Sequence, residues 1–478
     1  MLKVAGTAAG AVAVGAAVPT TAASAADAAF AHPGLLHTKA DLGRMATKVK
    51  AGTAPYRAGF ARLTANAHAQ STWKANPQTV VYRGSGSPEN YRTLYNDIHA
   101  AYQNALRWHI TGERAHADTA VAILNAWSGT LTELRGSADR FLAAGLYGYQ
   151  FANAAELVRD HEDFQLDRAQ KLLLNVFHPL SESFLADHNG AYITNYWANW
   201  DLTAIACVLA TGIFCDDRAK ADRAIDYFKH GKGMGSVKNA IPVVHSDGLA
   251  EWVEAGRDQG HALLGVGLMG TVCEMAWNQG VDLYGYDDSR FLKGAQYVAK
   301  WSTGGEVPYT SYTRQKGAPG KWSGKETASA AAGVDPAMTR PVWAMISNHY
   351  TKRRGLSAPY LTRIAARSAP EGGGGDYGPN SGGYDQLGFG TLAFTRDRAT
   401  TTEAKAEPKA SGPATHGASV TPGKSPSPSA QGGRSGDLAV SGAPDTGWAV
   451  AAGVAAIAGG ALLVRRGRVS RGTRNTES

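Results

Sequence analysis

Apolar residues recur every three to four positions through most of the chain between residues 29 and 397. This spacing predicts amphipathic helices that pack their apolar faces together. No segment shows a comparably strong alternation of apolar and polar residues, so strands are not expected to dominate. The predicted helices span residues 91–111, 114–134, 139–159, 166–177, 202–211, 219–228, 262–277, 288–301, 336–350 and 358–366.

The residues between these segments are typical of helix ends. Gly112, Gly212 and Gly280 occupy positions where C-terminal caps are expected, and Ser137 and Asp287 occupy expected N-cap positions. Many helices joined by short turns predict an all-α fold, and we expect an α/α toroid, that is, an incomplete α/α barrel. Such a fold has an inner and an outer ring of helices, with a cleft at one end. The strict repeat period of a solenoid is absent.

A glycine-rich segment, residues 371–386, interrupts the helical pattern. Glycine at this density permits close approach of the backbone and unusual dihedral angles. No Lys-Ser/Thr pair or helix start follows in the register of a phosphate-binding loop. Tyr377, Tyr384 and Asp385 are interleaved with the glycines, which argues against a flexible linker. We expect an ordered loop that packs over the cleft at the mouth of the toroid.

Both ends of the chain differ in composition from the predicted toroid. Residues 1–28 combine Lys3, an Ala/Val/Gly run and small residues up to Ala25 and Ala28, which is typical of a secretory signal peptide. Residues 398–437 are rich in Ala, Pro, Ser, Gly, Thr and Lys without apolar periodicity, which predicts a disordered linker. The sequence therefore predicts an exported protein with one folded domain, residues 29–397.

The last segment, residues 438–478, is predicted to attach the protein to the cell surface. An uncharged stretch, residues 448–464, precedes a basic tail that begins at Arg465. Its length is at the low end for a membrane-spanning helix, and the basic end is expected to stay in the cytoplasm. Residues 438–442 are similar to the Leu-Ala-x-Thr-Gly signal of Gram-positive sortases, with Ser441 in place of Thr. Sortase attachment to the cell wall and a plain membrane anchor are both open, and both make the folded domain extracellular.

The net charge and the cysteine content constrain the predicted function only weakly. The formal net charge is +8, which fits a polyanionic partner or a wall surface. We expect no nucleic acid partner. The three cysteines, an odd number, give no disulfide framework; buried free thiols are expected, with a Cys207–Cys215 bridge as the alternative in an exported protein.

Three clusters of polar and aromatic residues lie beside predicted helices. Glu254–His261 contains an arginine, two carboxylates, an amide and an imidazole, and it runs into the apolar stretch Ala262–Met269. Titratable groups at the start of a buried helix are costly unless they are paired or used. The other clusters are Asn195–Asp201 upstream and Val307–Tyr312 downstream.

Seven segments carry a resemblance to a known family: His32–His37, Ser137–Gln150, Asn195–Asp201, Gly256–His261, Val307–Tyr312, Arg340–Trp343 and Glu371–Gln386. In this order they resemble the alginate lyase-like superfamily of polysaccharide lyases, and within it the alginate and glucuronan lyase branch. The resemblance implies an α/α toroid that cleaves an acidic polysaccharide, a uronic-acid polymer, by β-elimination. It also implies an Asn, a His and a Tyr as catalytic residues and an Arg at the substrate carboxylate. We expect no cofactor.

β-Elimination removes the proton at C5 of a 4-O-linked uronate, next to the carboxylate. Hydrogen bonds or positive charge must stabilise the developing enediolate, and Asn199 and Arg257 can supply them. A base must reach C5, and an acid must protonate the leaving O4. Tyr312 is the preferred base because the family's tyrosine follows the Val-Pro-aromatic triplet after two residues, and Tyr309 is the alternative. His261 is the second candidate for proton transfer.

Other residues of the matching segments are expected to support the reaction. Asp258 is expected to orient Arg257 or His261, and the spacing of those two predicts that they lie on one side of a helical turn. His245, Asp247 and His261 do not form a zinc signature, so no catalytic metal is expected. The predicted substrate-binding residues are Asn195, Tyr196, Trp200, Gln259, Tyr309, Arg340, Tyr147 and Gln150.

Two other functions remain open at this point. A glycoside hydrolase on a similar toroid needs two opposed carboxylates, and Asp201 with Asp258 or Glu254 is the candidate pair. A non-catalytic wall protein could bind acidic glycan through the same cleft. Asn195 or Asn199 could also serve only as an N-cap, a role for which Asp201 is equally suited.

Overall fold

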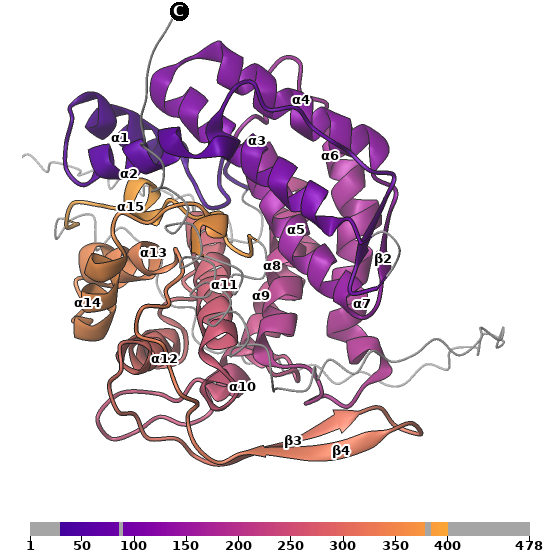
Figure 1. Ribbon diagram of the computed structural model, residues 1–478, viewed down its shortest axis with the longest axis vertical. Helices are drawn as coiled ribbons and strands as arrows, with labels where there is room; N and C mark the ends of the chain where they lie inside the picture. Colours follow the sequence, from indigo (N-terminus) through magenta and orange to yellow (C-terminus); the bar gives the residue numbers. More distant parts are fainter. Residues whose placement is uncertain (1–28, 86–88, 378–383, 400–478) are drawn as a thin grey trace, which may run out of the picture. The chain divides into compact units, whose positions relative to one another are not determined.

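Helices make up most of the chain that the computed structural model describes, which is residues 29–85, 89–377 and 384–399 (Figure 1). The α-helices are α1 Lys39–Lys50, α2 Tyr56–Ala65, α3 Tyr91–Thr111, α4 Arg114–Thr130, α5 Asp139–Glu156, α6 Leu166–Leu172, α7 His178–Asp187, α8 Ala198–Phe214, α9 Arg218–His230, α10 Val237–Ala240, α11 Gln259–Asn278, α12 Tyr286–Ser302, α13 Trp343–Asn348, α14 Pro359–Ser368 and α15 Gly390–Ala393. The strands are β1 Val80–Arg83, β2 Glu133–Gly136, β3 Tyr312–Gly317 and β4 Ser323–Ala328.

The helices form two layers. Along the inner layer, α3 packs against α5, α5 against α8, α8 against α11, and α11 against α13. In the outer layer, α4 covers α3, α7 covers α5 and α8, α9 covers α8, and α12 covers α11, while α14 packs on α12 and α13. This arrangement confirms the predicted all-α fold of the α/α toroid type.

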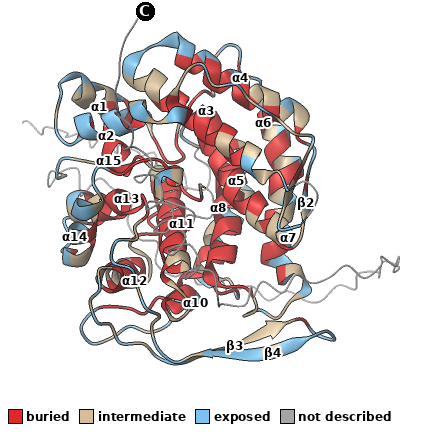
Figure 2. Cartoon of the chain, in the orientation of Figure 1, coloured by how far each residue is buried: buried red, intermediate tan, exposed pale blue. Residues whose placement is uncertain are grey.

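Burial follows from the sequence of each layer (Figure 2). Every residue of α8 is buried, as expected for a helix that is apolar on all sides. In α9 the buried residues recur on one side only, namely Ala221, Ala224, Tyr227 and Phe228. An outer helix needs only one apolar stripe because its other side faces water.

Inner helices point the same way. At their carboxyl ends, α5 and α11 both contact the N-terminal segment: Glu156 accepts a hydrogen bond from the Gly34 N–H (3.0 Å), and Asn278 donates to the Leu35 carbonyl (2.6 Å). At the amino ends, the Asn199 backbone of α8 lies beside Glu254, just ahead of α11. The positive ends of the α8 and α11 dipoles therefore lie at the same end of the fold, which favours an anion there.

Several predicted boundaries are wrong. The helix predicted over residues 114–134 ends at Thr130, because residues 133–136 form β2 beside β1. The one predicted over residues 336–350 begins only at Trp343. The short strands and α1, α2, α7, α10 and α15 went unpredicted, since short elements are set by tertiary contacts more than by periodicity.

Two predicted cap residues have other roles. Gly112 has a φ of 77° and ends α3 as expected. Gly212, however, lies inside α8, and a Cβ there would meet the Ala221 nitrogen of α9 at 2.5 Å. It permits close helix packing instead of a turn. Asp287 follows the first residue of α12 and pairs with Arg290, so it is not an N-cap.

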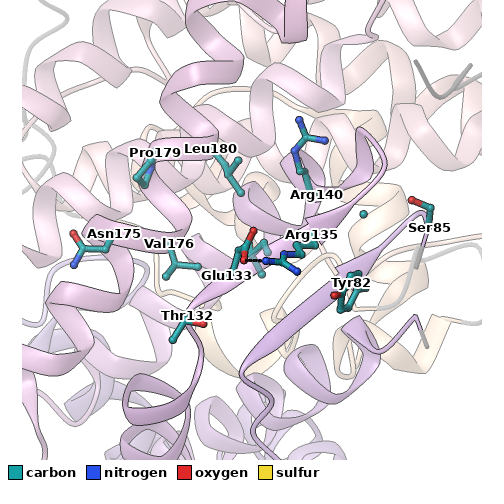
Figure 3. Close-up of a pocket in the computed structure, with 12 residues that line it drawn as sticks. Tyr82, Ser85, Thr132, Glu133, Arg135, Arg140, Asn175, Val176, Pro179 and Leu180 are labelled. Carbon is teal, nitrogen blue, oxygen red and sulfur yellow. Dashed lines mark ion pairs between the residues drawn. The ribbon is translucent and has the colours of Figure 1, made fainter. Parts of the chain in front are cut away.

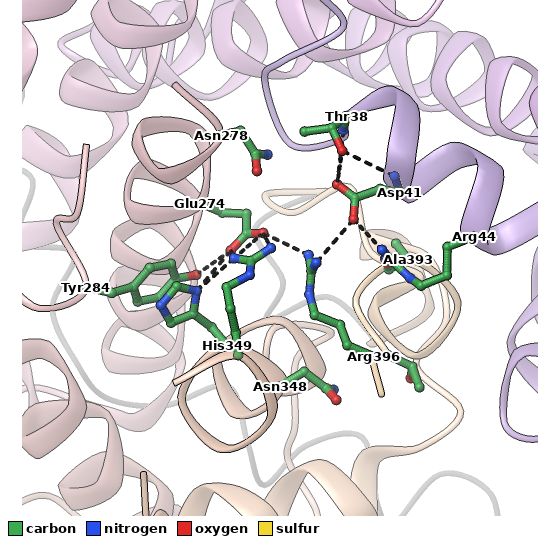
Figure 4. Close-up of polar contacts among 12 residues, drawn as sticks. Thr38, Asp41, Arg44, Glu274, Asn278, Tyr284, Asn348, His349, Ala393 and Arg396 are labelled. Carbon is green, nitrogen blue, oxygen red and sulfur yellow. Dashed lines mark hydrogen bonds and ion pairs between the residues drawn. The ribbon is translucent and has the colours of Figure 1, made fainter. Parts of the chain in front are cut away.

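A buried ionic network joins the two chain ends of the described region (Figure 4). Glu274 of α11 accepts hydrogen bonds from Arg353 (3.2 Å) and Arg396 (3.2 Å). Arg396 also lies 3.3 Å from Asp41 of α1, which pairs with Arg44. Burial alone would raise the pKa values of Glu274 and Asp41, but these arginines hold both below their ordinary values. Arg396 thereby ties α1 to α11.

We expect Arg396→Met to lower the free energy of unfolding at pH 7 by about 1–3 kcal/mol, because it leaves two buried carboxylates short of a cation. Both carboxylates have lowered pKa values, so their contribution is complete above the ordinary value of about 4 and is lost as the pH falls below it. Urea denaturation should therefore show a smaller difference from wild type at about pH 2 than at pH 7. Lys48→Met, which breaks the exposed Lys48–Asp397 pair, is the control and should change stability little. An equal loss in both variants would contradict a special role for Arg396.

The predicted signal peptide, residues 400–437 of the predicted linker and the C-terminal segment lie outside the described residues. So do residues 378–383 of the glycine-rich segment, whose predicted place over the cleft stays a prediction. Within the described ranges, no helix is both long and apolar enough to cross a membrane.

Candidate active site

His261 is held by the residue that caps its helix. Asp258 is the N-cap of α11: its Oδ1 accepts the His261 backbone N–H (2.8 Å), and its Oδ2 contacts His261 Nδ1 (2.7 Å). Burial alone would raise the pKa of Asp258, but the His261 contacts and nearby Arg257 lower it to about 2. A proton on Nδ1 satisfies this carboxylate and leaves Nε2 for other chemistry. The His261 side chain is 42% exposed, so a ligand can reach it.

Arg257 stands just ahead of α11 and is the last residue before the cap. Its Nε is 3.4 Å from Asp258 Oδ2, and its Nη1 is 3.7 Å from Glu254 Oε1. Nη1 is buried and has no hydrogen-bond partner. Because Arg257 precedes the helix, the prediction that it shares a helical turn with His261 is wrong; the shared carboxylate of Asp258 brings the two together instead.

Asn199 and Glu254 form the buried floor of this cluster. Asn199 lies in the first turn of α8, and its side-chain Oδ1 is buried without a hydrogen-bond partner. Burial raises the pKa of Glu254 to about 8, although Arg257 and the Asn199 backbone N–H oppose the shift. Glu254 is therefore mostly uncharged at neutral pH. It neutralises little of the positive charge of Arg257, which stays available to an anionic ligand.

The two candidate tyrosines differ in what holds their hydroxyl groups. Tyr309 donates to the Val253 carbonyl (3.2 Å), and burial raises its pKa to about 12. Within the described chain, the hydroxyl of Tyr312, the first residue of β3, contacts the Met234 sulfur (3.6 Å). Burial raises the pKa of Tyr312 as well, but Arg314 opposes the shift. Tyr312 is thus the tyrosine whose hydroxyl is not committed to a strong acceptor.

Trp197 and Arg314 complete the cluster. Trp197 belongs to the predicted cluster Asn195–Asp201, whereas Arg314 was not predicted from the sequence. The Trp197 ring has the Arg314 guanidinium 4.5 Å from its centre and the Arg257 guanidinium 5.8 Å away, and Tyr312 lies 6.1 Å from it, centre to centre. Two cations beside one aromatic ring form a positively charged wall. A strand prediction for residues 312–317 would have revealed Arg314, since every second residue shares a face.

Four other predicted residues lie around this cluster. Their side chains already pack against or form hydrogen bonds with other parts of the protein. Asn195 accepts a hydrogen bond from the Gly317 N–H (2.7 Å). Tyr196 and Trp200 are buried against one another, with ring centres 4.5 Å apart. Gln259 bonds to the backbone of Asp335. Their contact with substrate stays a prediction.

Three predicted residues belong to a second group. Tyr147 accepts a hydrogen bond from Arg83 (3.0 Å), Gln150 donates to the Tyr384 carbonyl (2.7 Å), and Arg340 pairs with Asp385 (2.8 Å). All three predicted residues are buried. Their contact with substrate also stays a prediction.

The carboxylate pair expected of a hydrolase is not free. Asp201 is fully buried and accepts hydrogen bonds from Tyr227 (2.9 Å) and the Gly235 N–H (3.1 Å), and it contacts His188 (2.7 Å). It does not cap α8, which begins at Ala198. With Asp201 committed in this way, it cannot serve as an acid or base toward a sugar.

A cavity of about 670 Å³ lies beside β1 and β2 (Figure 3). None of its lining residues belongs to the Arg257–His261 cluster. The residues that line the cavity are Tyr82, Ser85, Thr132, Glu133, Leu134, Arg135, Gly136, Arg140, Asn175, Val176, Pro179 and Leu180.

Within the described ranges, no three His, Cys, Asp or Glu side chains gather closely enough to hold a metal ion.

Residues 48–308 match the model of the alginate lyase family, and this range contains Asn199, Arg257 and His261. The chain belongs to the alginate lyase family. It is accordingly a polysaccharide lyase, and Tyr312 lies just beyond the matched range. No curated protein matches this sequence.

Solved alginate lyases are similar at low sequence identity. The crystal structure of alginate lyase A1-III from Sphingomonas species A1 is 15% identical over 78% of this chain and 98% of its own, with a TM-score of 0.45. A histidine-to-alanine variant of A1-III complexed with a tetrasaccharide is 14% identical over 79% and 100%, with a TM-score of 0.49. An alginate lyase from Bacteroides ovatus is 13% identical over 57% and 84%, with a TM-score of 0.40.

Proposed function

We propose that this lyase cleaves a polyuronate, alginate or glucuronan, by β-elimination and releases unsaturated oligouronides. One observation carries the proposal. A guanidinium with a buried, unbonded Nη1, Arg257, lies beside the Asp258-held His261 where the positive ends of α8 and α11 meet. That combination suits a carboxylate-bearing sugar whose ring carbon must lose a proton.

The residues divide the reaction between them. Arg257 and the Asn199 amide bind the uronate carboxylate and stabilise the enediolate that develops on it. Tyr312, as phenolate, removes the C5 proton; the C4–O4 bond then breaks and a C4–C5 double bond forms. His261, as an imidazolium paired with Asp258, gives a proton to the leaving O4. Arg314, held over the Trp197 ring, supplies the positive charge that favours ionised Tyr312 against the effect of burial.

A panel of polymers tests the function. Polymannuronate, polyguluronate, glucuronan and hyaluronan are each incubated with the protein, and ultraviolet absorbance and new reducing ends are followed. A rise in both signals with one polymer supports the lyase and identifies its uronate. New reducing ends without the chromophore would mean hydrolysis, and neither signal with any polymer would leave only a glycan-binding role.

Export and surface attachment belong to the same proposal. Their support is the composition of residues 1–28 and of residues 438–478, with the uncharged stretch 448–464. A lyase that cleaves extracellular polymers must be exported to reach its substrate. In cell fractionation, release by wall digestion alone supports sortase attachment, release by detergent alone supports a membrane anchor, and protein found only in the cytoplasm contradicts both.

Arg257→Lys should lower kcat/KM by about 10- to 100-fold, more than a change that keeps the charge normally would. Arg binds a carboxylate through two parallel hydrogen bonds, whereas Lys offers a point charge. Steady-state kinetics and the melting temperature are measured on one preparation. If the melting temperature falls while turnover per folded molecule is kept, Arg257 serves only to hold Glu254 and Asp258.

A further inference from the structure

Trp322 is the most exposed large apolar side chain in the described chain, with 60% of its surface accessible. It lies in the turn between β3 and β4, just before Ser323. Single exposed apolar residues are common on protein surfaces, so exposure alone says little. The residues around Trp322 on the hairpin indicate a role for this exposed side chain.

The pairing register places Trp322 in line with the active-site tyrosine. Tyr312 pairs with Ala328, and Lys316 pairs with Gly324. Because alternate residues share a face, Tyr312, Lys316 and Gly324 lie on one side of the hairpin, with Arg314 between the first two. A Cβ on Gly324 would lie 3.4 Å from the indole of Trp322, so that ring covers Gly324 on the same side. Tyr312, Arg314, Lys316 and Trp322 form one row, its first three members about 7 Å apart.

The row is rich in positive charge. Residues 312–328 contain four basic residues and one acidic residue, Glu326. Glu326 is 3.7 Å from Lys316 and pairs with Arg314. Lys321, exposed in the turn beside Trp322, has no ion pair with any described residue, whereas Lys325 pairs with Gln315 and lies on the other side of the hairpin.

The hairpin is held firmly against the segment that precedes α8. Thr194 Oγ1 accepts from the Gln315 N–H (2.9 Å) and donates to the Gln315 carbonyl (3.0 Å). Arg314 donates to the Asn195 carbonyl. In Figure 1 the hairpin runs past α10 at one end of the helices. Its row of side chains is therefore fixed relative to the active site, and binding along it needs little ordering.

We propose that this row is a binding track for the acidic polysaccharide, along which the chain extends from Tyr312 to Trp322. The indole of Trp322 stacks on the apolar face of a sugar ring distant from the cleaved bond, and Lys316 with Lys321 pairs with uronate carboxylates. The track deepens the proposed function and rests on it. A short oligosaccharide bound at Tyr312 does not reach the indole.

Trp322→Ala is compared with wild type on alginate polymer and on alginate tetrasaccharide. We expect KM for the polymer to rise about five- to tenfold and KM for the tetrasaccharide to change less than twofold. Trp322→Phe should recover part of the loss because it keeps an aromatic face. Leu356→Ala, another exposed apolar residue, and Lys171→Ala, an exposed lysine of the outer helix α6, should behave as wild type. An unchanged polymer KM, or an equal loss on both substrates with a lower melting temperature, overturns the track.

Binding is measured separately, so that the two proposals can fail independently. Each variant is run in native gels that contain alginate or, as a neutral control, dextran. If alginate retards wild type and retards Trp322→Ala less, the track is supported. This holds even if wild type does not cleave alginate, because a lack of cleavage would overturn only the proposed lyase activity on that polymer. Equal retardation of wild type and Trp322→Ala, or none of either, overturns the track.

Discussion

Tyr312→Phe should abolish nearly all turnover, with a loss of about 10²- to 10⁴-fold in kcat, while polymer binding stays within a few fold of wild type. The substitution keeps the ring beside Trp197 and removes only the hydroxyl, whose protein contact is the weak one to Met234. Little stability should be lost as a result. Burial raises the pKa of Tyr312, so the wild-type rate should also climb between pH 7 and 10 as the phenolate forms, and the residual activity of the variant should lack this rise.

Tyr309→Phe is the matched control. It removes a hydroxyl that donates to the Val253 carbonyl, so it should cost some stability and little turnover. Activity is followed by the absorbance of the unsaturated product, and binding by native gels that contain the polymer. If Tyr309→Phe is inactive and Tyr312→Phe is not, the base is Tyr309. If both remain active, neither tyrosine is the base.

His261→Ala should lower kcat by about 10²- to 10⁴-fold because it removes the group that we propose protonates O4. The cap of α11 survives, since Asp258 still accepts the backbone N–H of residue 261, and the melting temperature should change little. His230→Ala, an exposed histidine at the end of α9, serves as the control and should keep wild-type turnover. Full turnover in His261→Ala would remove His261 from the reaction.

Asp258→Asn separates orientation from charge at the same site. Asn is also a good N-cap, so the helix start is kept, but the imidazolium loses its carboxylate partner. We expect a loss of about 10- to 100-fold in kcat, smaller than that of His261→Ala. A loss as large as that of His261→Ala, without unfolding, would mean that Asp258 itself takes part in proton transfer.

The long helices could be predicted from the sequence because their periodicity is local. Residues 91–111 form α3 with the predicted bounds, and the apolar stretch that follows His261 forms α11. Arg257 and His261, which the sequence pointed to as site residues, both contact the Asp258 carboxylate. Spacing could not show that Arg257 precedes the helix, because that depends on Asp258 taking the N-cap position.

Long-range contacts decided the rest. The sequence by itself determined an all-α toroid, a set of polar residues at its inner helix ends, and Tyr312 as one of two candidate bases. Only the tertiary structure committed Asp201 to His188 and Tyr227, tied the Tyr309 hydroxyl to Val253, and brought Arg257 and Arg314 to the Trp197 ring. Each of these contacts joins residues that the chain separates by more than a helical turn, and hydrophobic periodicity carries no information about which distant polar groups become partners.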